Sequence, residues 1–287
     1  MTQVAIIGSA TRDRVVNGEI TRLKWGGVAV YSGLTLSRLG VSTSVVTNIA
    51  GRDSALMDLL STAGISVEAG GSDRTTEFAN HVSGDERRQE LLSRAAPISE
   101  SQVAEIAAKV DHVYLGPLHP LDIEPQAIKA LQGVDHIVVD IQGYTRKVEG
   151  VAVRSAVSEH LRLVLDQVDV VKASRDETEA VESFYGQGLG AIMQECGVDQ
   201  WLITDGARGG WLLSNSGVRH DFRAVPVNEI ADPTGAGDVF FAAYLTYHLY
   251  EGVDIDQALQ RASALTARHV EGRFITADEL AREGDVQ

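Results

Sequence analysis

The stretch Asp232-Pro233-Thr234-Gly235-Ala236-Gly237-Asp238 carries more structural information than any other part of the chain. Its two glycines allow a tight backbone turn whose N–H groups point outward. The segment that follows, Ala236–Leu249, is apolar on nearly every side, which is typical of a buried helix. Unpaired N–H groups at the start of such a helix, together with its dipole, predict a binding site for an anion such as phosphate.

Asp238 lies at the edge of this predicted anion site. The helix N-terminus favours the ionised carboxylate, which is the form that a general base requires. A substrate hydroxyl that gives its proton to Asp238 while it attacks phosphorus would separate the carboxylate from the phosphate. The structural alternative is an Asp that merely caps a glycine-rich turn. The complete seven-residue string favours the catalytic interpretation.

Around this loop, the chain alternates short β-branched runs with amphipathic segments. We expect strands at Val4–Ile7, Ser44–Thr47, His112–Leu115, His136–Ile141, Val168–Val171 and Trp201–Thr204. We expect helices at Val28–Leu39, Ala55–Ala63, Val103–Ala108, Pro125–Leu131, Val151–Leu165 and Glu177–Phe184. Several of the strands are apolar without alternation, which indicates parallel strands buried on both faces. The order predicts an α/β fold with a mostly parallel sheet covered by helices.

Two stretches interrupt this alternation with hairpin signals. Asn17-Gly18 within Arg14–Thr21 favours a tight two-residue turn, and Ser83–Glu86 separates two further strand-like runs, Glu77–Val82 and Arg87–Leu92. These four strands predict either a small accessory sheet or edge extensions of the main sheet. No linker, low-complexity tract or repeat divides the chain, so we expect one domain over residues 1–287, with hairpins at about residues 13–25 and 68–96.

Composition narrows the functional classes. The 287 residues are 44% hydrophobic and carry a formal net charge of −15, which argues against binding to nucleic acid or to an anionic membrane. The single cysteine, Cys196, fits a reducing compartment. No signal peptide or membrane-spanning run is evident, so we expect a cytoplasmic protein. The P-loop signature and the dinucleotide fingerprint are both missing from the sequence, as is the spacing of a transition-metal site.

The seven-residue string resembles the C-terminal signature of the ribokinase-like (PfkB) carbohydrate kinase family. Four further segments resemble that family's motifs in the same order: Gly8–Asp13, Gly26-Gly27, Lys172–Glu177 and Leu202–Gly206 with Gly209-Gly210. The resemblance extends over essentially the whole chain. It implies a three-layer α/β/α sandwich with a mostly parallel central sheet and a small β lid, which agrees with the hairpins expected above.

The resemblance also implies a role for each matching residue. It makes Asp238 the catalytic base and the backbone of Gly235, Ala236 and Gly237 the anion hole. The implied acceptor-binding residues are Asp13, Gly26 and Gly27; the implied ATP-site residues are Lys172, Thr204, Gly206 and Gly209. Glu177 would hold a water of the Mg²⁺ shell, and a monovalent cation is a further candidate cofactor. A homodimer formed through the lid is the candidate assembly.

Each of these positions also has a structural interpretation. Asp13 and the two glycines fit turns, Glu177 fits a first-turn acid favoured by the helix dipole, and Lys172 fits a solvated strand end. His119 and Gln142 follow two of the expected strands, and ligands in open α/β sheets bind at the carboxyl ends of strands. Gln142 is therefore a further candidate acceptor contact.

Two residues depart from the family pattern. Tyr31 stands where the family often has Asn; it either narrows the acceptor pocket or packs in the core with Val28 and Leu34. Ser174 replaces the usual Asn of the metal-water motif, and its shorter side chain would weaken metal binding. We expect an aromatic residue at position 31 to favour a six-membered ring over ribose.

The sequence therefore predicts an ATP- and Mg²⁺-dependent kinase for a hydroxyl of a small polyol. Leu115–Leu118, Asp140–Gly143 and the Asp-Pro-Thr of the signature resemble family members that act on cyclitols such as myo-inositol. A sugar or nucleoside acceptor is the alternative. A catalytically silent sugar sensor on the same fold is the alternative from another class, and the intact Gly-Ala-Gly-Asp string argues against it, because a sensor needs no base.

Overall fold

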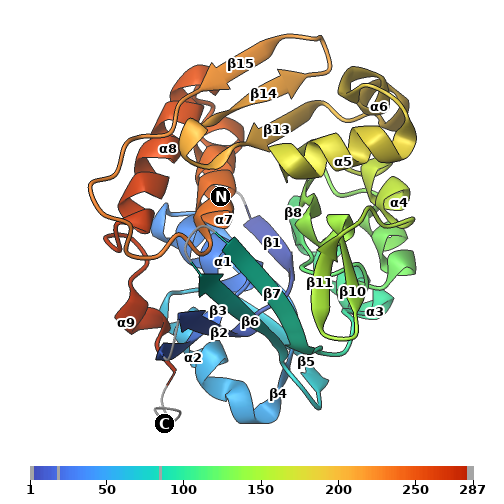
Figure 1. Cartoon of the computed structure of the whole chain (residues 1–287). Helices are drawn as coiled ribbons and strands as arrows, with labels where there is room; N and C mark the ends of the chain where they lie inside the picture. The colour runs from blue at the N-terminus through green and yellow to red at the C-terminus, as the bar shows by residue number, and fades with distance from the viewer. Residues whose placement is uncertain (1–2, 18–19, 84–85, 283–287) are drawn as a thin grey trace.

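The structure, a computed structural model, describes residues 3–17, 20–83 and 86–282. Its main sheet has nine strands in the order β15-β14-β13-β12-β9-β8-β1-β4-β5 (Figure 1). Their bounds are β1 Gln3–Gly8, β4 Ser42–Ala50, β5 Ser66–Ser72, β8 His112–Gly116, β9 His136–Asp140, β12 Val170–Ser174, β13 Gln200–Thr204, β14 Gly210–Ser214 and β15 Arg219–Phe222. The strands from β13 to β5 are parallel, and β14 and β15 extend the sheet in antiparallel pairs.

Helices cover both faces of this sheet. One face packs against α1 (Val28–Arg38), α2 (Ser54–Thr62), α7 (Ala236–Tyr244) and α8 (Ile255–Val270). The other packs against α3 (Glu100–Ala107), η2 (Pro125–Leu131), α4 (Leu161–Leu165), α5 (Arg175–Tyr185) and α6 (Leu189–Cys196). Alternate residues of β1 enter opposite cores: Val4 and Ile6 face the first, Ala5 and Ile7 the second. This confirms strands buried on both faces and the predicted three-layer fold.

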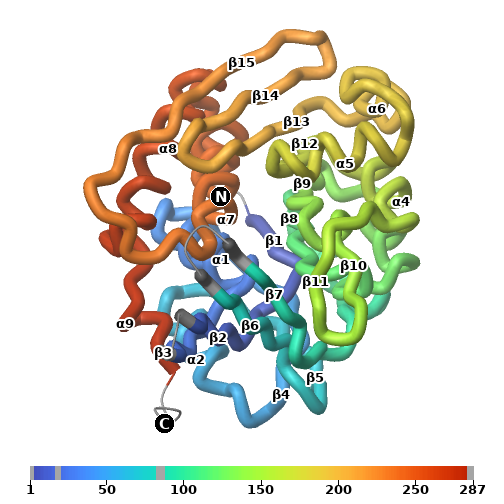
Figure 2. The backbone as a smooth tube through the Cα atoms, viewed as in Figure 1, coloured from blue at the N-terminus to red at the C-terminus, as the bar shows by residue number. Residues whose placement is uncertain are grey.

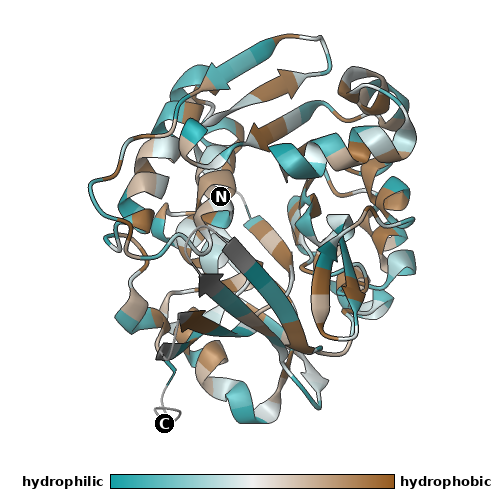
Figure 3. Cartoon of the chain, viewed as in Figure 1, coloured by the Kyte–Doolittle hydropathy of each residue, from teal (hydrophilic) through white to brown (hydrophobic). Residues whose placement is uncertain are grey.

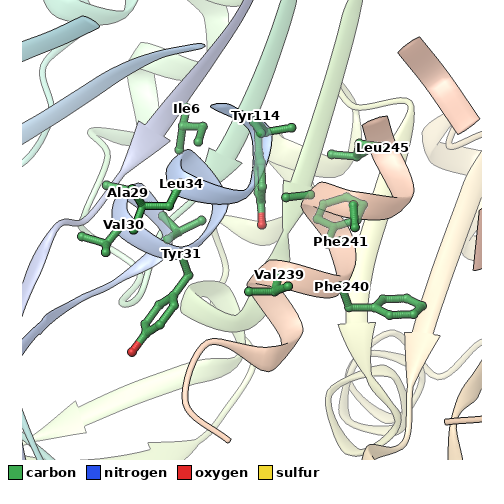
Figure 4. Close-up of a cluster of buried hydrophobic side chains, with 14 of the residues drawn as sticks. Ile6, Ala29, Val30, Tyr31, Leu34, Tyr114, Val239, Phe240, Phe241 and Leu245 are labelled. Atoms are coloured by element: carbon green, nitrogen blue, oxygen red, sulfur yellow. The ribbon is translucent and has the colours of Figure 1, made fainter. Parts of the chain in front are cut away.

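The first core is centred on helices α1 and α7, which lie against each other. Figure 4 shows Tyr31 and Leu34 of α1 on one side and Val239 and Phe241 of α7 on the other, with the Tyr114 ring of β8 between the two helices. The Tyr114 and Phe241 rings meet edge to face at 5.1 Å. Helix α7 is apolar all round because it is enclosed by α1, α8 and the sheet, and this packing fixes the position of the loop that precedes it.

A second sheet of six strands forms the lid, in the order β10-β11-β7-β6-β2-β3. Its strands are β2 (Thr11–Asn17), β3 (Ile20–Gly26), β6 (Thr76–Ser83), β7 (Glu86–Ser93), β10 (Arg146–Glu149) and β11 (Ala152–Ser155). The structure thus has strands at both expected hairpins. These strands belong to an accessory sheet and are not edge extensions of the main sheet. The turn residues 18–19 and 84–85 lie outside the described residues, so the predicted tight turn at Asn17-Gly18 stays a prediction.

The β10–β11 hairpin corrects one expectation. We expected a helix over Val151–Leu165, but β11 begins at Ala152 and the helix, α4, occupies only Leu161–Leu165. The alternation Val151-Ala152-Val153-Arg154 suits a strand as well as a helix end, and pairing with β10 over Arg146–Glu149 decides for the strand. This third hairpin brings Arg146 to the lid.

The remaining short elements connect these layers. They are η1 (Gly51–Asp53), η3 (Ile141–Thr145), η4 (Gly206–Arg208), the π-helical turn η5 (Leu245–Tyr250) that continues α7, and α9 (Ala277–Leu280). The tube in Figure 2 shows the chain entering the lid from the main sheet several times, and Figure 3 shows hydrophobic residues concentrated on the strands of the main sheet and the inner sides of the helices. None of the described helices has the length and apolar composition needed to cross a membrane.

Candidate active site

The signature loop and the first turn of α7 form the floor of a pocket between the main sheet and the lid. Gly235 caps the helix in the left-handed region with φ 78°, a conformation that glycine adopts without strain. A Cβ atom at Gly235 would lie only 2.3 Å from the Tyr31 ring, so the loop also needs glycine for space. The N–H of Gly237 belongs to the first turn of the helix, where no carbonyl of a preceding helical turn is available to it, whereas the N–H of Ala236 donates to the Pro233 carbonyl at 3.2 Å.

A buried ion pair lies beside this loop. Lys172 Nζ is 2.7 Å from Asp140 Oδ2, and the two residues are each 5% exposed. A Cβ atom on Gly237 would lie 3.1 Å from Lys172 Nζ, so the ammonium group rests against the anion hole. Burial alone would lower the pKa of Lys172, but Asp140, Glu177 and Asp238 raise it above its ordinary value. Lys172 is therefore a fixed positive charge beside the signature loop and not a solvated strand end.

The environment of Asp238 corrects one sequence-based expectation. The helix N-terminus was expected to favour the ionised carboxylate, yet withdrawal from water, reinforced by the negative charge of Asp140, raises the pKa of Asp238 to about 7. Lys172 and Arg146 act in the opposite direction. A carboxyl group with a pKa near neutrality can both accept and release a proton at physiological pH, which is the property of an effective general base.

The lid supplies a second wall of the pocket. Asp13 of β2 is 6% exposed and accepts a hydrogen bond of 2.9 Å from Thr11 Oγ1 to its Oδ1. A Cβ atom on Gly26 would lie 2.4 Å from the other carboxylate oxygen, Oδ2, so only glycine leaves Asp13 in place. Gly26 itself does not line the pocket; Gly27 does. Of the two glycines expected to bind the acceptor, Gly27 lines the pocket, whereas Gly26 leaves room for the Asp13 carboxylate.

Polar side chains from the lid hairpins continue this wall. Gln89 Nε2 donates to Asn80 Oδ1 at 2.9 Å across the β6–β7 pair. Arg146 donates from Nη1 to the Leu118 carbonyl at 3.2 Å, and its guanidinium lies 5.9 Å from the centre of the Phe78 ring. Gln142 of η3 faces the same space. These groups offer several donors and acceptors within a small volume, as recognition of a polyhydroxylated ring requires.

The pocket thus contains most, though not all, of the residues expected from the sequence. It has a volume of about 170 Å³ and is lined by Thr11, Asp13, Gly27, Tyr31, Phe78, Asn80, Gln89, Leu118, Asp140, Gln142, Arg146, Lys172 and Pro233–Asp238. His119 lies outside it, because its Nε2 is 2.9 Å from Asp122 Oδ1 in a buried pair.

Of the four predicted nucleotide-site residues, Lys172 lines the pocket, and Thr204, Gly206 and Gly209 do not. Thr204 ends β13, and Gly206 and Gly209 belong to the turn between β13 and β14. Register pairs Thr204 with Ser174, which ends β12, so these residues share the carboxyl edge of the sheet with the signature loop. This is the edge at which ligands bind in open α/β sheets.

Glu177 caps the start of helix α5, a structural role that is separate from the metal-water role predicted from the sequence. Ser174 N donates to Glu177 Oε2 at 2.7 Å, and Glu177 N donates to Ser174 Oγ at 3.2 Å, which is a capping box at the start of α5. The Ser that departs from the family pattern is therefore the residue that caps this helix. One carboxylate oxygen of Glu177 is committed to the cap.

Tyr31 lies in the hydrophobic core and also borders the pocket. It is 1% exposed, shares the core with Val28 and Leu34, and meets His269 edge to face at 5.6 Å. Its ring packs against Gly235. Tyr31 therefore packs in the core, as one expectation had it, and its ring also lines the pocket, so the structure does not exclude the other.

Several pocket residues were missed by sequence reasoning. Asn80, Gln89 and Arg146 lie on lid strands that match no motif, so nothing in the sequence distinguished them. Asp140 did carry a signal, because an acid at the carboxyl end of an apolar strand is placed where ligands bind.

Comparison with known proteins agrees with this geometry. A family model described as pfkB family carbohydrate kinase matches residues 1–273. Among solved structures, the chain is similar to a pyrophosphate-dependent kinase in the ribokinase family complexed with a pyrophosphate analogue and myo-inositol. That likeness has a TM-score of 0.81 and 25% identity, and it covers 93% of this chain and 95% of the other.

Two curated relatives match over a shorter span. A 5-dehydro-2-deoxygluconokinase of Bacillus velezensis is 30% identical over 128 residues, and a fructokinase of Escherichia coli is 31% identical over 119 residues. The matched segments are 43% and 41% of this chain and span 38% of the length of each relative.

Proposed function

Because the chain belongs to the pfkB family of carbohydrate kinases, we propose that it transfers a phosphoryl group to a ring hydroxyl of a small polyol, specifically a cyclitol such as myo-inositol. One observation carries the proposal. A carboxyl group suited to act as a base, a glycine-rich anion hole and a wall of polar lid side chains all border one pocket. The likeness to a pyrophosphate-dependent kinase solved with myo-inositol supports the choice of acceptor.

In this mechanism, Asp238 accepts the proton of the acceptor hydroxyl as the hydroxyl oxygen attacks phosphorus. The bond from phosphorus to the leaving oxygen of the donor breaks, and the oxygens of the transferring group gain negative charge. The N–H groups of Gly235 and Gly237 and the ammonium of Lys172 stabilise that charge. Asp13, Asn80 and Gln142 hold the other hydroxyls, so that only one faces the base.

The donor is either ATP or inorganic pyrophosphate. ATP is the donor that the sequence resemblance implies, with Thr204, Gly206 and Gly209 bordering the nucleotide. Pyrophosphate is the second candidate, since the neighbour reported above is a pyrophosphate-dependent kinase. Both donors present the same diphosphate group to Lys172 and the anion hole, so the mechanism at Asp238 is the same.

Mg²⁺ fits this site as an ion held chiefly by the donor. No group of three His, Cys, Asp or Glu side chains suited to a metal occurs within residues 3–17, 20–83 and 86–282. Mg²⁺ commonly keeps several waters and binds through one or two carboxylates plus substrate phosphates. We propose that the uncommitted oxygen of Glu177 holds one of those waters. When bound, the ion would neutralise charge on the donor phosphates.

An acceptor and donor panel tests the proposal. We expect myo-inositol to be phosphorylated with a higher kcat/KM than ribose or fructose 6-phosphate, with either ATP or pyrophosphate as donor. Coupled assays that detect ADP or orthophosphate, with each acceptor omitted in turn, give these values. If ribose is the best acceptor, the cyclitol assignment is wrong although the kinase assignment survives. Donor hydrolysis that no acceptor accelerates would contradict both.

The pKa of Asp238 predicts a pH profile. Because only the ionised carboxylate accepts a proton, kcat/KM should fall about tenfold per pH unit below a midpoint near pH 7 and level off above it. Asp140→Asn removes a negative charge that raises this pKa, so its midpoint should move to lower pH. Glu179→Gln on the exposed side of α5 is the control and should leave the midpoint unchanged. An unshifted midpoint in Asp140→Asn would refute the charge coupling.

Assembly through the lid stays a proposal. Light scattering of the purified chain tests it, since a homodimer has twice the mass of the 30.8 kDa monomer.

A further inference from the structure

An ion pair joins the lid to the signature loop. Lys24 of strand β3 binds Asp232, the first residue of the seven-residue string, through Nζ and Oδ2. The Lys24 side chain is 8% exposed and the Asp232 side chain 34%. Neither residue lines the pocket, and neither has a part in the mechanism above. A lysine so deeply buried loses most of its hydration, which its partner must replace.

Each residue of this ion pair is close in the chain to a residue of the candidate site. Lys24 is two residues before Gly26, the glycine against which the Asp13 carboxylate rests. Asp232 Oδ1 accepts a hydrogen bond of 2.9 Å from Thr234 N, and Thr234 precedes Gly235 of the anion hole. One ion pair therefore connects the strand that shapes the acceptor end with the loop that would hold the donor phosphates.

Two further side-chain contacts near the Asp232 end of the loop involve neutral partners, whereas Lys172 lies at the other end, beside Gly237. His269 Nε2 lies 2.8 Å from the Thr234 carbonyl, and withdrawal from water lowers the pKa of His269, which favours its neutral form. The ring of Tyr31 packs against Gly235. These contacts fix the shape of the loop but do not alter its charge, so the negative charge of Asp232 depends on Lys24 for compensation.

Compensation matters because Asp232 stands next to a site for anions. An uncompensated carboxylate there would repel the donor phosphates, and the repulsion is strong where water is excluded. Burial alone would raise the pKa of Asp232, but Lys24 and the bonds to Thr234 lower it, so the carboxylate stays ionised beside the ammonium.

We propose that Lys24 is a positioning residue: its ammonium is a built-in cation that neutralises Asp232 and holds the anion-hole loop in register with the acceptor strand. This inference rests on the proposed function. Because Lys24 already compensates the charge of Asp232, we expect that no monovalent cation is needed at this carboxylate. Turnover is therefore expected to be the same in K⁺ and in choline at equal ionic strength.

Three variants test this role. Lys24→Met keeps the length of the side chain and removes the charge, and Lys24→Met combined with Asp232→Asn removes both charges. Arg38→Met is the matched control, because Arg38 pairs with Glu279 and joins α1 to α9 without contacting the loop. Each variant is compared with the wild type in kcat, in KM for donor and acceptor, and in thermal unfolding.

We expect Lys24→Met to lower kcat by about 10- to 100-fold, since small displacements of reacting groups have effects of this size. The double variant should be more active than Lys24→Met, because it no longer leaves a carboxylate uncompensated. Arg38→Met should change kcat by less than about twofold, as expected for a partly exposed pair. A double variant no more active than Lys24→Met, or activation of the wild type by K⁺, would overturn the proposal.

Hydrogen exchange gives a reading that does not depend on activity. Amides of residues 232–238 should exchange faster in Lys24→Met than in the wild type and Arg38→Met, even if Lys24→Met has lost all turnover. Unchanged exchange in Lys24→Met would overturn the positioning role. If the wild type transfers phosphate to no acceptor, the proposed function fails, and the exchange rates still decide whether Lys24 orders the loop.

Discussion

Asp238→Asn is expected to lower kcat by about 10²- to 10⁴-fold, the usual loss when a general base is removed. Asn has nearly the size and shape of the neutral carboxyl group, so α7 and the anion hole should keep their structure. Donor binding, measured by calorimetry, should therefore change little while turnover collapses. The reason is chemical: an amide cannot accept the proton of the acceptor hydroxyl.

The control for this prediction is Asp176→Asn. Asp176 is also an acid in the first turn of a helix, α5, but it is exposed and does not line the pocket. That variant should keep wild-type turnover. Near-wild-type kcat in Asp238→Asn would show that Asp238 only caps the turn, which is the structural alternative raised by the sequence.

Asp238→Asn should also change stability in a predictable direction. Burial raises the pKa of Asp238 in the folded state, so the folded protein favours the protonated form and loses stability as pH rises from the ordinary Asp value through about 7. Asn stays neutral at every pH. The variant should therefore be more stable than the wild type at pH 8, with a smaller difference at pH 4. Thermal unfolding at the two pH values tests this, and a less stable variant at pH 8 would contradict it.

Gly235→Ala is expected to have the second-largest effect on turnover, a loss of about 100-fold in kcat. The added Cβ would lie 2.3 Å from the Tyr31 ring, so either the ring or the loop must move. Because Tyr31 is enclosed by the core, we expect the loop to move, which displaces the N–H groups of the anion hole. Steady-state kinetics with saturating donor and acceptor measures the loss.

Two further variants separate the causes of that loss. Gly40→Ala introduces the same change at φ 82°, where no atom lies within 4 Å of the added Cβ, so it reports backbone strain alone and should keep full turnover. Tyr31→Leu combined with Gly235→Ala provides room for the methyl group and should recover part of kcat. Normal turnover in Gly235→Ala would mean that the loop geometry is not critical.

The local parts of the site were predictable because they are contiguous in sequence. The loop Asp232–Asp238 and helix α7 follow from glycine spacing and an apolar run, and both lie where expected. The lid strands β2, β3, β6 and β7 followed from hairpin signals. Such features depend on the near neighbours of each residue, which the sequence displays directly.

What could not be predicted depends on tertiary structure. The Asn80–Gln89 pair requires the register of β6 and β7, and Arg146 reaches the pocket only because β10 and β11 form a hairpin. The raised pKa of Asp238 results from burial and from Asp140, which is 98 residues away in the chain. No local sequence pattern shows that Asp140 and Asp238, so far apart in the chain, interact in the folded protein.

Phosphorus NMR of the reaction mixture tests the central claim most directly. The wild type is incubated with Mg²⁺, myo-inositol and either ATP or pyrophosphate, with Asp238→Asn in parallel. The account predicts a new phosphomonoester resonance, coupled to a ring proton, that grows as the donor is consumed in the wild type and is nearly absent in Asp238→Asn. Release of orthophosphate alone, or equal ester formation by both proteins, would contradict it.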